Sequence, residues 1–251
     1  MQIEINTFIQ ENLKNLKNKN FSKKYISQFI FPIINKINNS KDNKFIIAGS
    51  QGAGKSTLAK IFKLVLENVY KKKVMLLSID DYYLSKNKRK KLSKNIHPLL
   101  ITRGVPGTHD IVALKNDIIT FQKKNFPINT PRFNKLKDDI SSKKNIIKKA
   151  EILLLEGWCC GSPSINKKYL FQNINRLETI FDKNKKWRQY YNSQLMKNYK
   201  KVFSLFDQQI YIQPPSFSYI LKWRYNQEKN NALKSRNKDF MNKKDLQKFI
   251  Q

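Results

Sequence analysis

The sequence has 251 residues, of which 40% are hydrophobic and 12% aromatic, so the chain can bury a sizeable core and is not an intrinsically disordered protein. Lysine and arginine number 50 against 18 acidic residues, a formal net charge of +32. Such an excess usually indicates a nucleic acid or an anionic membrane as partner. Here the basic residues are spread along the chain among Asn, Ile, Phe and Tyr, as a bias toward A/T-rich codons would place them. We therefore expect no specific nucleic-acid partner and no membrane.

We expect a soluble, cytoplasmic protein, because the sequence shows neither a bilayer-spanning run nor a secretory signal. No apolar run approaches the roughly 18 to 20 residues that span a bilayer. The first residues, Met1–Asn6, lack the basic-then-apolar order of a secretory signal. Cys159 and Cys160 are adjacent, which is an awkward spacing for a disulfide and unsuited to a metal site, so a reducing compartment is the simple interpretation.

Two helices are predicted in residues 1–40, because apolar residues recur at helical spacing over 5–16 and again over 29–37. Pro32 is expected to kink or divide the second helix. Since no linker and no internal repeat is visible, we expect a single domain, 1–251, with this N-terminal helical segment packed on it. The oligomeric state is left open.

The rest of the chain alternates nearly all-apolar strands with helices. This order predicts an α/β fold with a doubly wound parallel sheet that is covered on both faces. The lysine-rich stretch 86–91 is predicted to be a solvated loop, and residues 125–150 a polar, loop-like segment. The predicted strands are 44–48, 74–79, 151–155 and 208–212, and the predicted helices are 58–69, 110–124, 187–206 and one after Pro214-Pro215.

Residues 49–56 fit the phosphate-binding pattern G-x-x-x-x-G-K-[ST], between an apolar strand and an amphipathic helix. Glycines permit backbone angles that let successive N–H groups converge on phosphates, and the helix N-terminus favours anions. Lys55 is predicted to reach the β- and γ-phosphates of ATP, and Ser56 to ligate Mg²⁺. The predicted nucleotide site comprises Gly49, Ser50, Gln51, Gly52, Ala53, Gly54, Lys55, Ser56 and Thr57.

Carboxylates follow two of the predicted strands, at the edge where ligands of such sheets bind. Glu156 stands just after strand 151–155 and is predicted to be the second metal ligand. Asp80 and Asp81 follow strand 74–79. With a reference pKa of about 3.9, Asp80 is ionised at neutral pH and is predicted to accept the proton of an attacking hydroxyl. Asp81 is expected to cap a turn or to support its neighbour.

The stretch from Arg103 to Asp110 reads RGVPGTHD, in which glycine and proline fix a rigid turn. Arg103 and His109 are candidates to hold an anionic or hydroxylated substrate, because arginine suits bidentate carboxylate binding. An equally good interpretation is a simple turn that leads into a helix capped by Asp110.

The strings GSQGAGKST, SIDDYY, RGVPGTHD, PRFNK, LLLEGWCCG and LKWRYNQE, in this order, resemble the P-loop kinases related to plant-type D-glycerate 3-kinase, over about residues 45–250. The resemblance implies the doubly wound sheet of nucleoside and pantothenate kinases, ATP and Mg²⁺ as cofactors, and phosphoryl transfer to D-glycerate. It implies catalytic roles for Asp80, Lys55 and Arg224, the last as a lid-type arginine on the transferring phosphate. The acceptor pocket that it implies contains Tyr83, Arg103, His109, Arg132 and Lys135.

Two positions depart from the family's pattern and bear on the identity of the acceptor. Asn134 replaces the acid of PRFDK, and Ile140 follows Asp138-Asp139 where an arginine is common. A kinase for a nucleoside or another small hydroxy acid is therefore a second interpretation. A nucleic-acid-associated ATPase is suggested only by charge. A degenerate nucleotide-binding regulator is disfavoured, since the motif residues are retained.

Overall fold

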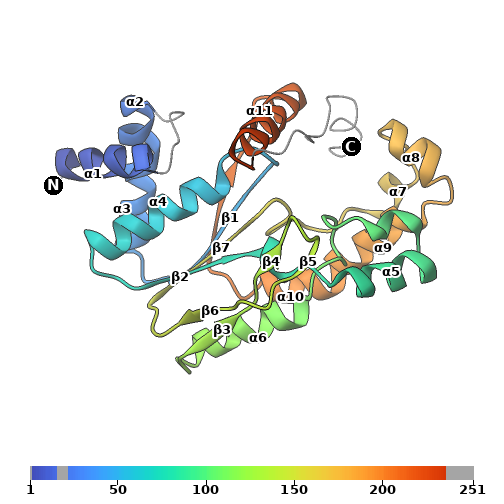
Figure 1. Ribbon diagram of the computed structural model, residues 1–251, viewed down its shortest axis with the longest axis horizontal. Helices are drawn as coiled ribbons and strands as arrows, with labels where there is room; N and C mark the ends of the chain where they lie inside the picture. Colours follow the sequence, from blue (N-terminus) through green and yellow to red (C-terminus); the bar gives the residue numbers. More distant parts are fainter. Residues whose placement is uncertain (1, 16–21, 236–251) are drawn as a thin grey trace.

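A parallel sheet of four strands forms the centre of the computed structural model, which describes residues 2–15 and 22–235 (Figure 1). All six residues of its strand β7 are buried. Glu156 of this strand is paired with Ile47 on one side and with Ser78 on the other, so the carboxyl ends of the strands meet at one edge. In spatial order the strands are β2 (Val74–Ser78), β7 (Ile152–Gly157), β1 (Lys44–Gly49) and β8 (Gln208–Ile212).

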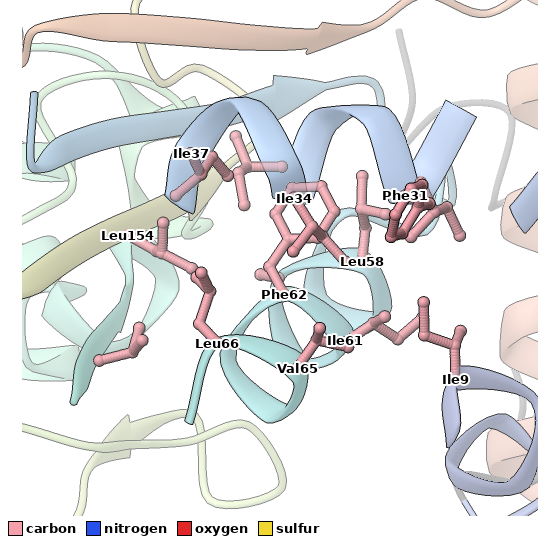
Figure 2. Close-up of a cluster of buried hydrophobic side chains, with 14 of the residues drawn as sticks. Ile9, Phe31, Ile34, Ile37, Leu58, Ile61, Phe62, Val65, Leu66 and Leu154 are labelled. Atoms are coloured by element: carbon pink, nitrogen blue, oxygen red, sulfur yellow. The ribbon is translucent and has the colours of Figure 1, made fainter. Parts of the chain in front are cut away.

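Each face of the sheet is covered by its own hydrophobic cluster, because alternate residues of a strand point to opposite faces. Helices α1 (Gln2–Asn15), α3 (Phe31–Asn39) and α4 (Lys55–Asn68) cover one face. Figure 2 shows Phe62 and Leu66 of α4 in one cluster with Ile34 of α3 and the sheet residue Leu154. The next residue, Leu155, belongs to the other face, where α6 (Ile111–Gln122) and a helical run over 186–203 pack. The doubly wound α/β fold is confirmed.

The two N-terminal helices are also confirmed, and Pro32 does not divide the second one. Residues 23–39 form one continuous helical run: α2 (Lys23–Tyr25), a wider π-helical turn (Ile26–Ile30) and α3. In the wider turn the N–H of Phe31 donates to Ile26 O, five residues back. Because the proline ring disturbs the carbonyl four residues before it, a wide turn directly ahead of Pro32 lets the helix continue.

The loop prediction for the lysine-rich stretch 86–91 is wrong, because these residues begin a helix, α5 (Lys86–Asn95). The side chain of Ser85 caps it by accepting from the N–H of Lys88, and lysine is a good helix former. Arg89 is 1% exposed, so this stretch is not fully solvated either.

Residues 125–150 are also more ordered than predicted. They form two antiparallel pairs, β3 (Ile128–Thr130) with β6 (Asn145–Ile147) and β4 (Phe133–Asn134) with β5 (Asp139–Ile140). Strands of two or three residues are too short for an alternating pattern, so the polar composition was misleading.

The helix predicted at 187–206 is confirmed as a continuous run of α9 (Lys186–Gln194), a π-helical turn (Leu195–Tyr199) and α10 (Lys200–Phe203). The short helices α7 (Lys167–Leu170) and α8 (Arg176–Phe181) were not predicted, and α11 (Phe217–Ser235) follows the two prolines as expected. None of the helices in the described residues has both the length and the apolar character needed to cross a membrane. Cys159 and Cys160 are free and buried.

Candidate active site

The loop between β1 and α4 has the backbone of a phosphate-binding loop. Gly54 has a φ of 85°, in the left-handed region that favours glycine, directly before the helix begins. At Gly52 a Cβ atom would lie 2.9 Å from the Cβ of Trp223, so α11 rests directly on the loop. Lys55 Nζ donates to Ser50 O at 2.7 Å and thereby lies folded back over the same loop. Burial lowers the pKa of Lys55, an effect that the carboxylates of Glu156 and Asp80 oppose.

Ser56 and Glu156 meet at the carboxyl edge of the sheet, where Ser56 Oγ donates to Glu156 Oε1 at 3.0 Å. Glu156 lies within β7 and not after it as predicted, because the strand continues to Gly157. Burial raises the pKa of Glu156, against the hydrogen bonds from Ser78 and Ser56. A cavity of about 140 Å³ borders this pair and is lined by Ser56, Lys60, Leu76, Ser78, Asp81 and Glu156.

The oxygens around this cavity fit a magnesium ion carried by a nucleotide. Hydroxyl and carboxylate oxygens are preferred Mg²⁺ ligands, and Mg²⁺ in kinases is held by one or two protein groups together with phosphates and water. Within the described part of the chain, no three or more His, Cys, Asp or Glu side chains are grouped to hold a metal by themselves. Ser56 and Glu156 therefore suit an ion that arrives with ATP better than a resident metal.

Asp80 lies in a 3₁₀ turn (Ile79–Tyr82) that directly follows β2. Lys135 Nζ donates to Asp80 Oδ2 at 2.7 Å, and the Tyr83 hydroxyl donates to Oδ1 at 3.0 Å. Burial alone would raise the pKa of Asp80, but Lys135, His109 and Tyr83 together hold it below its usual value. The carboxylate is therefore ionised at neutral pH.

Asp81 binds a different partner from Asp80, because its Oδ1 accepts from the N–H of Phe133 at 3.1 Å. It thereby ties the β4–β5 pair to the turn that follows β2. The expectation was that Asp81 caps a turn or supports Asp80, and the hydrogen bond that the structure shows is to Phe133 instead. Burial raises the pKa of Asp81 despite this hydrogen bond.

The 103–110 turn runs beside the segment that follows Asp80. Leu84 N–H donates to Thr108 O at 2.9 Å, and Asp110 N–H donates to Tyr82 O. The rings of Tyr83 and His109 stack with centroids 4.4 Å apart. Asp110 Oδ1 accepts from Ala113 N–H and caps α6, so the interpretation as a turn followed by a helix cap is confirmed. The same turn also places His109 against Tyr83.

His109 has a partner that the sequence did not reveal. Its Nδ1 lies 2.6 Å from the hydroxyl of Tyr199, which also accepts from Gly107 N–H at 2.8 Å. Burial lowers the pKa of His109 to about 4, so the imidazole is neutral at pH 7. Tyr199 lies in the apolar stripe of its helix together with Leu195 and Val202, and this spacing is typical of a core residue.

Arg103 is paired with Asp138, and the same carboxylate lies 2.9 Å from Nη2 of Arg89. The guanidinium carbons of Arg103 and Arg89 lie 5.6 and 5.9 Å from the centroid of the Phe133 ring. The sequence pointed to Arg103 but to neither Arg89 nor Asp138. The pairing with Asp138 fixes the direction of the Arg103 guanidinium.

Arg132 and Lys135 flank an open hollow of about 360 Å³ on the β4–β5 pair, with Phe133, Asn134 and Ser141 as its other lining residues. Asn134 Oδ1 accepts from the N–H groups of Leu136 and Lys137, both at 3.0 Å. An aspartate would make the same two hydrogen bonds, so the departure from the family pattern at this position preserves the turn.

Arg224 lies on α11, the helix that rests on the phosphate-binding loop. Its guanidinium donates to Gln227 at 2.8 Å and pairs with Glu228 at 2.5 Å. Burial lowers the pKa of Arg224, and the charges of Asp80 and Arg103 also act on it. A Cβ atom at Gly52 would lie 3.0 Å from the backbone N of Arg224, so this residue stands directly over the phosphate-binding loop.

The structure thus gathers most of the predicted site residues at one edge of the sheet. Arg132 is the most peripheral of them, being exposed and linked to the site through the charge of Asp81. The residues gathered are Lys55, Ser56, Asp80, Tyr83, Arg103, His109, Lys135, Glu156 and Arg224.

Comparison with known protein sequences identifies kinases that are similar to this chain. No family model matches the chain. An uncharacterized kinase of Schizosaccharomyces pombe is 28% identical over 220 residues, which cover 81% of this chain and 76% of that protein. The chloroplastic D-glycerate 3-kinase of Arabidopsis thaliana is 29% identical over 191 residues, 71% of this chain but only 39% of the plant protein. The chain is thus similar to kinases, one of which is a D-glycerate 3-kinase.

The solved structures agree on the fold. D-glycerate 3-kinase from Cryptococcus neoformans superimposes with a TM-score of 0.73 and 24% identity, over 88% of this chain and 82% of that one. A likeness at this level of identity concerns the architecture alone. The P-loop kinase fold predicted from the motifs is confirmed. These likenesses do not identify the molecule that accepts the phosphoryl group.

Proposed function

We propose that this protein transfers the γ-phosphoryl group of ATP to a hydroxyl group of D-glycerate. The observation that carries the proposal is the meeting of three features at one sheet edge: the phosphate-binding loop, the carboxylate of Asp80 and the rigid turn with Arg103 and His109. The backbone N–H groups of residues 49–57 hold the triphosphate. Ser56 and Glu156 would hold the Mg²⁺, which would neutralise charge on the phosphate oxygens.

Asp80 acts as the base. It accepts the proton of the acceptor hydroxyl, the hydroxyl oxygen forms a bond to the γ-phosphorus, and the bond from that phosphorus to ADP breaks. Lys135 keeps Asp80 ionised until it takes this proton. Lys55 and Arg224 donate to the oxygens of the transferring group, where negative charge needs preorganised donors. A positioned base contributes about 10²- to 10⁴-fold to the rate.

The acceptor pocket favours a small acid over a flat nucleobase. Arg103, Arg132 and Lys135 supply positive charge around it. The faces of the Tyr83 and His109 rings stack on each other, so these two faces are not available to stack on a nucleobase. An arginine fork binds a carboxylate with two parallel hydrogen bonds. D-glycerate carries one carboxylate, which the arginine fork would bind, and two hydroxyls, one of which would meet Asp80.

The test is a screen for ADP release by the purified protein with ATP and Mg²⁺. D-glycerate is expected to be the best acceptor in a panel that includes L-glycerate, other hydroxy acids, sugars, nucleosides and pantothenate. Phosphorylation of a nucleoside in the absence of any D-glycerate turnover would contradict the proposal. ADP release that duplex DNA or RNA stimulates would favour the ATPase interpretation.

The matched control is Lys55→Ala, which removes a cation that meets the phosphates. We expect it to lose most of the turnover and to bind ATP more weakly, which a contaminating kinase would not do. Wild-type turnover in this variant would exclude the phosphate-binding loop as the nucleotide site.

A further inference from the structure

The two nitrogens of the buried His109 ring have different surroundings. Nδ1 lies 2.6 Å from the Tyr199 hydroxyl. Nε2 is equally buried but has no hydrogen-bond partner among the residues that the structure describes. The ring stacks on Tyr83, whose hydroxyl donates to Asp80, so His109 lies in the shell around the proposed base. A buried polar atom without a protein partner is costly, which points to a ligand as its partner.

The hydrogen bonds of Tyr199 determine which nitrogen carries the proton. Its oxygen already accepts from the N–H of Gly107 at 2.8 Å, so its own proton is left to donate. Nδ1 of His109 lies at hydrogen-bond distance from this hydroxyl, and we assign it as the acceptor of that proton. A neutral imidazole that accepts at Nδ1 carries its proton on Nε2. Because burial lowers the pKa of His109 to about 4, the ring stays neutral at pH 7.

We infer that Tyr199 is a positioning residue that holds His109 in the Nε2–H tautomer, so that the ring offers an N–H donor to the phosphoryl acceptor. This inference rests on the proposed function and narrows the chemistry of the acceptor. The group that faces His109 has an oxygen lone pair, as a carboxylate or a hydroxyl has. An ammonium group in its place is rejected, because a polar site that loses its hydrogen bond discriminates strongly.

The tautomer is read directly by NMR of protein labelled with ¹⁵N-histidine. The chain has two histidines, His97 and His109, and His97→Gln leaves a single ring to assign. We expect a protonated, pyrrole-type Nε2 and an unprotonated, pyridine-type Nδ1, unchanged from about pH 8 to about pH 5. Tyr199→Phe removes the donor to Nδ1 and is expected to mix the two tautomers.

A wild-type ring protonated at Nδ1 would overturn the inference. The measurement needs no turnover and no variant of Tyr199, so it decides the tautomer even if Tyr199→Phe folds poorly. It also stands apart from the proposed function, since a protein that ignores D-glycerate still gives a spectrum.

Steady-state kinetics with D-glycerate then test whether the tautomer matters. Tyr199→Phe is expected to raise the KM for D-glycerate about five- to tenfold, with the KM for ATP unchanged. The matched control is Tyr190→Phe: this hydroxyl comes from the same helical run and reaches Gly107 O, at 3.4 Å, but makes no hydrogen bond to His109. It is expected to change the KM by less than about twofold.

A double-mutant cycle separates positioning from packing. The amide of His109→Gln carries a donor and has no tautomers, so Tyr199→Phe is expected to add nothing to the KM on this background. If Tyr199→Phe raises the KM equally on both backgrounds, Tyr199 acts through packing and the inference is wrong.

Discussion

The buried imidazole of His109 makes the stability of this protein depend on pH in a defined window. In the unfolded chain its pKa is about 6.5, whereas burial lowers the pKa to about 4 in the folded protein. Between these two values the unfolded state binds more protons, so the free energy of unfolding falls as the pH falls from about 6.5 to about 4. At about 1.4 kcal/mol for each pH unit, His109 accounts for a loss of about 3 kcal/mol across the window.

The assay is urea unfolding at a series of pH values from about 7.5 to 4, for the wild type and for His109→Gln, whose side chain does not titrate. Taking the difference between the two proteins cancels the carboxylates that titrate in both. The variant is expected to gain about 2 to 3 kcal/mol relative to the wild type as the pH falls. Tyr190→Phe keeps His109 and should keep the wild-type pH dependence. A difference that stays constant with pH would show that the imidazole is not held neutral by burial, and the reasoning above would fail.

Three further substitutions test the buried arginine of α5 and two residues of the candidate active site. Arg89→Met should lower the free energy of unfolding by about 3 kcal/mol, because the buried guanidinium pairs with Asp138 and donates to the carbonyl oxygens of Leu84, Ile101 and Asp138. Lys90→Met, on the exposed side of the same helix, should cost less than about 0.5 kcal/mol, and equal losses in the two variants would contradict the buried role of Arg89. Asp80→Asn should lower kcat by about 10²- to 10⁴-fold with little change in the KM for D-glycerate. The control is Asp81→Asn, which keeps the oxygen that accepts from Phe133 N–H and should keep most of the rate. Equal losses of kcat in the two variants would exclude Asp80 as the base. Arg103→Lys should raise the KM for D-glycerate by about one to two decades because lysine lacks the planar fork, and an unchanged KM would remove Arg103 from the pocket.

The sheet could be predicted because its signals are local. Residues 152–155 read Ile-Leu-Leu-Leu, which is typical of a strand buried on both faces, and the other core strands are similar. The β3–β6 and β4–β5 pairs could not be predicted, because each is formed by two or three residues whose partners lie elsewhere in the chain. Helix α5 was hidden by its lysines, although Ser85 at its start was a readable cap.

The candidate site also contains some residues that the sequence marks and others that it does not. Lys55 belongs to the phosphate-binding motif, Asp80 follows the end of β2, and Glu156 lies near the carboxyl end of β7, so the sequence alone marks them. Tyr199 acts on a residue 90 positions away, and its spacing is that of a core tyrosine. Arg89 reaches Asp138 across 49 positions, and the one hint was that an arginine, the residue of choice for buried ion pairs, stands within a run of lysines.

Three of the cations proposed to bind anions are already paired with a carboxylate of the protein: Arg103 with Asp138, Lys135 with Asp80 and Arg224 with Glu228. Pairing orients a long side chain before a ligand arrives and so reduces the conformational entropy that binding must fix. The consequence differs between the two residue types. A guanidinium has five donors in a planar fork, so it can hold one carboxylate and still bind a second anion, whereas an ammonium is a compact charge with three donors. For this reason Arg103→Lys is expected to weaken acceptor binding even though the positive charge is retained.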